Sequence, residues 1–281
     1  MTEELGEKEG SQLKVILKPV ARIILNSITS ILYYCGLVDV ISFIRRIVFK
    51  RCRILVLAYH SIGIDRGRDK YQINPVLLDR QLGYLNLRYK VIPLLDLVDI
   101  LKSGKGLRHD YVALTFDDGL KNNFSEALPI LKKYNFNATF FITMDNIGKK
   151  DYLGWDEILL LKREGFELGS HAIKHLPLPG LPYNQAREQI FSSKLLLEER
   201  LGSPVKYLAY PFGSFDKNII NLAKAAGFEA AFSTVSQSCD PDLSDTFCLE
   251  RKEIYNQPLH SFAVKIEGLF EKHRFQVFSE K

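Results

Sequence analysis

The feature that most constrains the fold of this chain is a repeated alternation of short apolar runs and longer helical patterns, which begins at about residue 53. Short apolar runs between turn-forming residues are typical of buried strands, whereas apolar residues every three or four positions are typical of helices. Strands are expected at 54–59, 91–92, 111–116, 138–142, 167–168, 206–209 and 229–232, and helices at 75–89, from 94, and at 125–134, 156–163, 184–201 and 216–226. About seven such units predict a parallel sheet covered by helices that closes into an α/β barrel, with an open doubly wound sheet as the alternative.

The residues before the barrel form a different kind of segment, rich in Ile, Leu and Val over 13–43. Its polar residues recur at steps of three or four and would share one helix face: Lys18, Arg22, Asn26, Thr29 and Tyr33. This pattern favours an amphipathic helix that lies on a membrane or on the protein's own core, because a spanning helix would place the polar face in hydrocarbon. We therefore expect an N-terminal helical segment over 1–52 and a larger domain over 53–281.

Charge and composition limit the partners and the compartment. A basic cluster at 45–53 is either a solvated helix end or a site of attraction to an anionic membrane, so peripheral membrane contact through 13–53 is a hypothesis. The net charge of +5 comes without a basic stripe interleaved with aromatic residues, and we expect no nucleic-acid partner. The four cysteines lack CxxC spacing and are expected to be reduced. Four glutamates in the first ten residues argue against a cleavable signal peptide and favour a cytoplasmic location at the inner membrane surface; export or membrane anchoring is the alternative.

Two adjacent carboxylates, Asp117 and Asp118, directly follow the strand expected at 111–116. Functional groups gather at the carboxyl ends of strands in parallel α/β folds. Adjacent like charges need a cation or a shared proton, so one aspartate can bind a metal while the other works as a base. A plain turn is the alternative, since Asp and Gly form turns. Phosphatase-type chemistry would need Asp-x-Asp spacing, which the contiguous pair lacks.

Two histidines, His171 and His175, follow the strand expected at 167–168. The spacing His-x3-His allows both imidazoles to bind one zinc or similar ion. An isolated pair of this kind is more often a surface pair, but an aspartate pair on a neighbouring strand favours a metal site. Two imidazoles and one carboxylate suit zinc, and also cobalt, nickel or iron.

Two further strand ends carry candidate groups. Tyr210, Pro211 and Phe212 precede a glycine and form a corner that can present a backbone N–H to a developing oxyanion and aromatic rings to a sugar. A rigid turn with core aromatic residues is the alternative. His60, at the end of the first barrel strand, is a candidate general acid; the alternative is a polar residue whose hydrogen bonds are made within the protein and which has no catalytic role.

In combination these motifs resemble the polysaccharide deacetylases (carbohydrate esterase family 4). The signatures are Thr115–Gly119, Ser170–His175 and Tyr210–Gly213, and the resemblance runs from about residue 54 to residue 254. It implies a distorted (β/α) barrel of about seven parallel strands, with 53–281 as the catalytic domain. It also implies that Asp118, His171 and His175 bind a divalent metal, that Asp117 is the base for a water activated by that metal, and that the Phe212 N–H stabilises the oxyanion.

Two positions depart from the family pattern. Ala209 stands where the third motif usually has Arg, and Leu249-Glu250-Arg251 stands where Leu-x-His usually supplies the acid. Both departures are similar to the branch that includes poly-β-1,6-N-acetylglucosamine deacetylases, in which a histidine near the start of the domain is the acid. The resemblance then implies that His60 protonates the leaving amine and that Arg251 orients Asp117 and keeps it ionised.

The function expected from these motifs is metal-dependent hydrolysis of the N-acetyl group of an N-acetylated sugar or polysaccharide, with Zn²⁺ as the first choice of metal and an N-acetylated glycan as the partner. The motifs indicate C–N hydrolysis more narrowly than they indicate the substrate. Hydrolysis of a non-sugar amide or a cyclic imide on the same scaffold therefore stays open. A non-catalytic glycan-binding protein is the rival from another class, because Arg is lost at position 209.

Overall fold

The computed structural model describes residues 23–49, 51–64, 69–103, 107–234, 245–269 and 277–279. By its internal contacts the chain divides into two compact units. The first contains the described residues of 1–50 and 257–272, and the second contains those of 51–256 and 273–281. Each unit is described by itself below.

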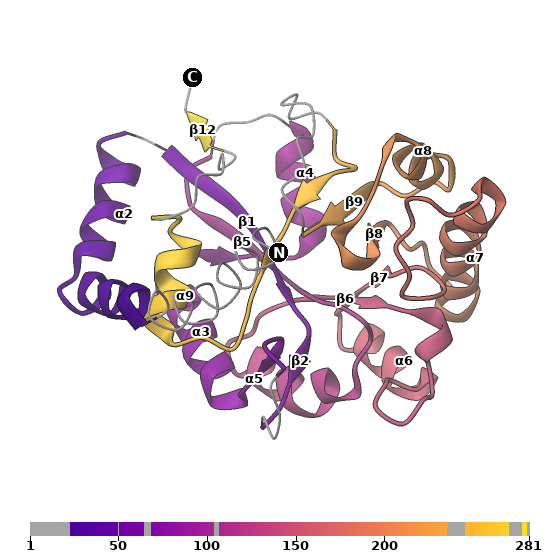
Figure 1. Cartoon of the computed structure of the whole chain (residues 1–281), viewed down its shortest axis with the longest axis horizontal. Helices are drawn as coiled ribbons and strands as arrows, with labels where there is room; N and C mark the ends of the chain where they lie inside the picture. Colours follow the sequence, from indigo (N-terminus) through magenta and orange to yellow (C-terminus); the bar gives the residue numbers. More distant parts are fainter. Residues whose placement is uncertain are drawn as a thin grey trace, which may run out of the picture. The chain divides into compact units, whose positions relative to one another are not determined.

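The second unit is built on a sheet whose strands follow the order β10-β9-β8-β7-β6-β5-β1-β11 and pair in parallel throughout. These strands are β1 (Arg51–Tyr59), β5 (Tyr111–Phe116), β6 (Thr139–Ile142), β7 (Glu167–Ser170), β8 (Tyr207–Ala209), β9 (Ala230–Ser233), β10 (Leu249–Glu250) and β11 (Lys252–Glu253). The two last pieces flank Arg251; β10 pairs with β9 and β11 pairs with β1, so this segment closes the ring. The predicted distorted barrel of about seven parallel strands is confirmed, and the open sheet is not formed (Figure 1).

Helices surround this sheet (Figure 1). They are α3 (Pro75–Arg88), α5 (Leu128–Lys133), α6 (Trp155–Arg163), α7 (Tyr183–Leu201) and α8 (Lys217–Ala225). Local signals fix several of their ends: the Asn74 side chain accepts a hydrogen bond from the Val76 N–H at the start of α3, and the Asp216 side chain accepts one from the Ile219 N–H at the start of α8. The helix expected at 125–134 begins instead as a π-helical turn, η1 (Asn123–Ala127).

Shorter strands complete the sheet. β4 (Lys90–Val91) pairs with the beginning of β5, and β12 (Val277–Ser279) runs antiparallel to β1. β2 (Ser61–Ile62) and β3 (Gln72–Ile73) form a separate parallel pair. The thiols of Cys35 and Cys52 are reduced, as expected, but Cys248 is disulfide-bonded, so the expectation of reduced cysteines is wrong for that residue.

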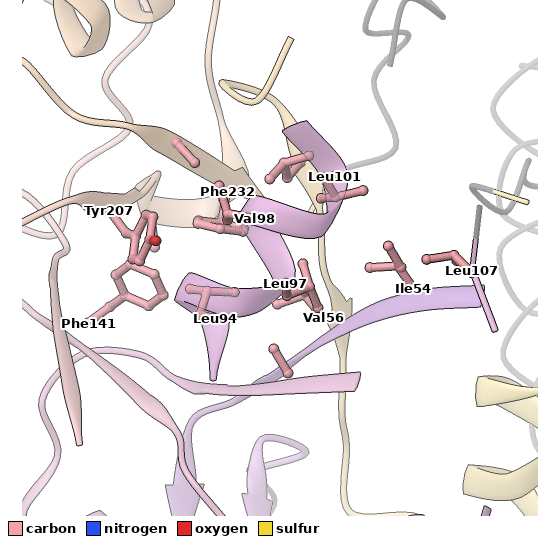
Figure 2. Close-up of a cluster of buried hydrophobic side chains, with 14 of the residues drawn as sticks. Ile54, Val56, Leu94, Leu97, Val98, Leu101, Leu107, Phe141, Tyr207 and Phe232 are labelled. Carbon is pink, nitrogen blue, oxygen red and sulfur yellow. The ribbon is translucent and has the colours of Figure 1, made fainter. Parts of the chain in front are cut away.

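One further helix, α4 (Leu94–Ser103), packs at the amino end of the barrel against side chains that point into its interior. Its buried residues Leu94, Leu97, Val98 and Leu101 belong to the same apolar cluster as side chains of β1, β5, β6, β8 and β9 (Figure 2). Along each strand these contacts come from alternate residues, such as Ile54 and Val56, because successive side chains of a strand point to opposite faces. The apolar packing leaves the carboxyl ends of the strands as the place for polar groups.

The first unit contains the helix Ile23–Tyr34, α2 (Leu37–Ile47) and α9 (Leu259–Ile266). Among the described helices, none is by itself both long and apolar enough to cross a membrane. The pair Ile23–Tyr34 and α2 meets the criteria of length and composition only when taken together, with a bend of 65° between its members. Most of the segment 13–43 that was expected to be helical therefore lies in this pair, while residues 13–22 are outside the described part.

Candidate active site

The carboxyl ends of the barrel strands bring together the residues that the sequence singled out. His60 follows β1, the pair Asp117-Asp118 follows β5, His171 follows β7, the Tyr210–Phe212 turn follows β8, and Arg251 separates β10 from β11. The strands are parallel and neighbouring, so their carboxyl ends share one edge of the sheet. Residues from distant parts of the chain thus meet at one mouth of the barrel.

Asp118, His171 and His175 form a cluster that can hold a metal ion. One ligand atom of each residue lies within 4.8 Å of the others. Asp118 Oδ1 is 3.5 Å from His171 Nε2 and 3.4 Å from His175 Nε2. This oxygen is buried, and within the described part of the chain it has no hydrogen-bond partner. A buried carboxylate oxygen facing two imidazole nitrogens fits a divalent cation, which would supply the missing partner.

The orientation of His171 suits a metal ligand. Its Nδ1 lies 2.8 Å from the backbone carbonyl oxygen of Ala209, which can only accept a hydrogen bond, so Nδ1 carries the proton. Nε2 then keeps its lone pair toward Asp118. Burial lowers the pKa of His171 more than the charges of Asp117 and Asp118 raise it, which favours the neutral imidazole that metals bind.

Asp117 is paired with Arg251 in the barrel interior. Arg251 Nη1 donates to Asp117 Oδ1 and Nη2 donates to Oδ2, both at 2.7 Å. Nη1 also donates to the Thr115 hydroxyl at 3.1 Å. Asp117 and Arg251 are only 2% and 1% exposed, and the guanidinium carbon is 5.2 Å from the centre of the Phe141 ring. Such a bidentate pair fixes both the charge and the orientation of the carboxylate.

The charge balance keeps Asp117 ionised. Burial alone would raise its pKa, but the Arg251 guanidinium opposes burial and, with smaller contributions from His171 and His60, holds the pKa of Asp117 well below its usual range. The carboxylate is therefore available as a proton acceptor over the whole physiological range of pH.

His60 is held against an aromatic group at the same mouth. Its ring centre lies 4.8 Å from that of Tyr71, which in turn lies 5.4 Å from that of Tyr255. Its buried Nδ1 has no hydrogen-bond partner among the residues that the structure describes. The backbone also joins the two strand ends here, because the Asp117 N–H donates to the Tyr59 carbonyl at 2.9 Å. His60 is thus an imidazole near Asp117 whose Nδ1 lacks a hydrogen-bond partner among the described residues.

The turn after β8 divides its three candidate residues between the core and the surface. Tyr210 is buried, donates its hydroxyl to the Phe247 carbonyl at 2.9 Å and stacks on Phe215. Pro211 is buried as well. Phe212 is 54% exposed, has a positive φ of 57°, and its ring centre is 4.3 Å from that of His175. Of the three, Phe212 alone presents its ring to solvent beside the proposed metal ligands.

Three contacts in the site were not foreseen. The Ala209 carbonyl orients His171, Thr115 shares the guanidinium of Arg251 with Asp117, and Tyr71 packs on His60. The sequence could have placed Thr115 in the site, because Thr115 precedes Asp117 by two residues and side chains two positions apart in a strand point to the same face. A backbone carbonyl has no sequence signal, and Tyr71 lies in a part of the chain that resembles no motif.

Comparison with known proteins places this site in context. The polysaccharide deacetylase family model matches residues 104–231. A Bacillus subtilis protein named as a polysaccharide deacetylase, YxkH, is 29% identical over 66% of this chain and 66% of its own length. The poly-β-1,6-N-acetyl-D-glucosamine N-deacetylase of Staphylococcus aureus is 24% identical over 81% of this chain and 88% of its own length. The chain thus spans slightly less than two thirds of YxkH and most of the staphylococcal enzyme.

A solved structure shares the fold. The deacetylase PplD of Streptococcus pyogenes, determined in complex with acetate, superposes with a TM-score of 0.68 at 22% identity. The superposition covers 76% of this chain and 98% of that chain. At this identity the likeness supports the barrel architecture alone.

Proposed function

We propose that this chain, whose residues 104–231 match the polysaccharide deacetylase family model, hydrolyses the N-acetyl group of an N-acetylated sugar or polysaccharide in a metal-dependent reaction. The observation that carries the proposal is the convergence of Asp118, His171 and His175 beside the Asp117–Arg251 pair. Three metal-ligating side chains next to a buried carboxylate that is kept ionised are an arrangement suited to metal-assisted hydrolysis of an unreactive amide.

Asp118, His171 and His175 would hold the metal through one carboxylate oxygen and two imidazole nitrogens. Zinc suits this donor set, and cobalt, nickel or iron are alternatives. A divalent cation bound there would polarise the acyl carbonyl and lower the pKa of a coordinated water. The hydrogen bond from His171 to the Ala209 carbonyl would orient the imidazole for this purpose.

The remaining residues would move protons and stabilise charge. Asp117 would accept a proton from the attacking water. The bidentate contact with Arg251 would keep the Asp117 carboxylate ionised and fix its orientation. His60 would donate a proton to the leaving amine as the C–N bond breaks, so that water and the amide become acetate and a free amine. The backbone N–H of Phe212 would donate to the oxyanion of the tetrahedral intermediate, and the exposed Phe212 ring would contact the sugar.

The substrate class is argued from the relatives. The staphylococcal relative is named as acting on poly-β-1,6-N-acetyl-D-glucosamine, and it covers most of the present chain. We therefore propose an N-acetylglucosamine polymer as the first substrate to test. A non-sugar amide or cyclic imide would use the same chemistry. A non-catalytic glycan-binding protein is disfavoured, because binding alone gives no reason to bury an ion pair beside three candidate metal ligands.

The test is acetate release from N-acetylglucosamine oligomers of β-1,6 and β-1,4 linkage by the purified full-length protein. The protein is assayed as isolated, after chelation, and after chelation and return of Zn²⁺, with bound metal measured in parallel. Release that is lost on chelation and restored by metal supports the proposal, and the preferred linkage identifies the glycan. A stoichiometric metal without release from any oligomer would point to another amide. Absence of both metal and release would contradict the enzymatic reading.

For the compartment, the disulfide at Cys248 supports the exported alternative over a cytoplasmic location, since such bonds persist in oxidising surroundings. Alkylation of the protein isolated from its native cells, followed by mass spectrometry, tests this proposal. A Cys248 thiol that is free to react in freshly lysed cells would restore the cytoplasmic location.

A further inference from the structure

Several polar residues of the two N-terminal helices point inward. In the helix Ile23–Tyr34, Asn26 Oδ1 accepts a hydrogen bond from the Ser261 hydroxyl at 3.3 Å. The Thr29 hydroxyl lies 3.0 Å from His260 Nδ1, and Thr29 is 3% exposed. Ser261 and His260 belong to α9, so the polar face of this helix packs against another helix of the same unit.

The second helix behaves in the same way (α2 in Figure 1). The Ser42 hydroxyl donates to Glu267 Oε2 at 2.7 Å, and Arg45 Nη2 donates to the same oxygen at 3.5 Å. Glu267, which directly follows α9, is 3% exposed, and Arg45 is 9% exposed. Polar residues of both helices therefore hold them on α9, whereas Ser27, Asp39 and Arg46 are exposed.

The consequence is an apolar outer surface. Thirteen large apolar side chains of residues 23–49 are exposed, whereas the rest of the described chain exposes eight. We call these thirteen the outer apolar face: Ile23, Ile24, Leu25, Ile28, Ile31, Tyr34, Leu37, Val40, Phe43, Ile44, Ile47, Val48 and Phe49. Single exposed apolar residues are ordinary, but such a concentration within one short segment marks an interaction surface.

The sequence of this segment indicates the partner. Residues 13–53 contain eight basic residues and one acid, Asp39. Of the basic side chains that the structure describes, Arg45 and Arg53 are buried. Arg46 is exposed within α2, among the outer apolar residues. An apolar helix face combined with a strong excess of positive charge is the combination that binds an anionic lipid surface. If this face bound a second copy of the chain, the positive charges of the two copies would repel each other, which disfavours a dimer interface.

The geometry favours a helix pair that lies in the membrane surface. The helices have 12 and 11 residues and meet at 65°, so each is about 16–18 Å long against a hydrocarbon core of about 30 Å. A spanning arrangement would also draw the buried Arg45–Glu267 pair into hydrocarbon, at high cost.

From these observations we propose that the outer apolar face docks on an anionic phospholipid bilayer as a monotopic anchor. This proposal goes beyond the hydrolysis proposed above, because it assigns a separate role to the first unit. Partial insertion of Ile, Leu and Phe side chains supplies most of the binding, and the basic residues add attraction to the headgroups.

The experiment is flotation of the full-length protein with vesicles of phosphatidylcholine, with and without phosphatidylglycerol. We expect binding to the anionic vesicles, and weaker binding without phosphatidylglycerol or at high salt. The double variant Phe43→Glu/Ile47→Glu should bind at least about tenfold more weakly, since two inserted apolar side chains are replaced by charges. The matched control Leu87→Glu/Leu195→Glu changes two leucines of the second unit that are more exposed than Phe43 and Ile47, and it should bind as the wild type does.

A second measurement needs no substitution. Cys35 is an exposed free cysteine between the two helices, and an environment-sensitive fluorophore attached to it should shift to the blue when anionic vesicles are added. Absence of both flotation and a spectral shift would overturn the proposal. So would vesicle binding by the glutamate variant at wild-type strength. A concentration-dependent dimer of the wild type that the same variant abolishes, without vesicle binding, would assign the face to a second copy of the chain.

Discussion

The two ends of the barrel interior each contain a carboxylate, and the pKa values of the two are shifted in opposite directions. Asp117 lies at the carboxyl end, where Arg251 outweighs the effect of burial and its pKa is lowered. Glu167, the first residue of β7, lies at the amino end, where burial dominates and its pKa is raised. Glu167 accepts hydrogen bonds from the Thr139 hydroxyl at 2.7 Å and from the Leu95 N–H of α4 at 3.1 Å.

The difference lies in the partners. Neutral donors such as a hydroxyl and a backbone N–H only reduce the cost of burying a carboxylate, whereas a guanidinium in bidentate contact reverses it. The amino end can therefore serve packing, because Glu167 there only accepts hydrogen bonds, one of them from the first turn of α4. The carboxyl end keeps a full negative charge in a buried position, which serves chemistry.

The largest expected effect concerns Asp117. Asp117→Asn should lower kcat/KM for acetate release by about 10²–10⁴-fold, because an amide cannot accept the proton of the attacking water. The matched change at the other end, Glu167→Gln, should leave kcat/KM unchanged. Steady-state assays of both variants, with bound metal measured, make the comparison. Equal losses in the two variants would mean that the two ends do not differ in function.

The next effect concerns the partner of Asp117. Arg251→Gln should lower the free energy of unfolding at neutral pH by about 3–5 kcal/mol, because it leaves a buried carboxylate unpaired. A lowered pKa in the folded state stabilises above the unfolded pKa and loses this contribution as pH falls. The deficit of the variant should therefore shrink in acid. Urea denaturation followed by the fluorescence of Trp155, at neutral and acid pH, measures it.

A double variant provides the control. Asp117→Asn/Arg251→Gln removes both charges and should recover part of the lost stability, whereas additive losses would deny the coupling between the two residues.

At the amino end, packing should matter and catalysis should not. Leu97 of α4 is fully buried in the apolar cluster (Figure 2), and Leu97→Ala should lower the free energy of unfolding by about 2–5 kcal/mol. The folded variant should keep the wild-type kcat. Leu87→Ala, at a leucine that is 78% exposed, should change stability by no more than about 0.5 kcal/mol. A selective loss of kcat in Leu97→Ala would show that the two ends are coupled.

The smallest effect is the pH dependence due to Glu167. Its raised pKa means that the folded protein binds more protons than the unfolded chain between the usual and the raised value, so stability falls as pH rises through that window. Glu167→Gln should lack this decline. Denaturation curves of both proteins across the window should converge or cross as pH rises. A difference independent of pH would mean that Glu167 titrates normally.

The sequence was sufficient for the residues that sit next to strand ends. The strand 111–116 was predicted with the bounds that β5 has, and this places Asp117 and Asp118 at the barrel mouth. His171 and His175 followed from the same reasoning on β7. The last strand was not predicted, because its two pieces are two residues each and Arg251 interrupts them.

What the sequence by itself determined is the local order of strands and helices and the chemical kind of group at each strand end, since both depend on short-range periodicity. Only the tertiary structure decided which groups meet. Closure of the ring brings Arg251 onto Asp117 across 134 positions. Packing places α4 across the amino end of the barrel, against side chains that point into its interior. In the first unit, hydrogen bonds to α9 decide that the polar faces point inward. Hydrophobic pattern specifies that a helix has two faces, but only the available partners determine which face is buried.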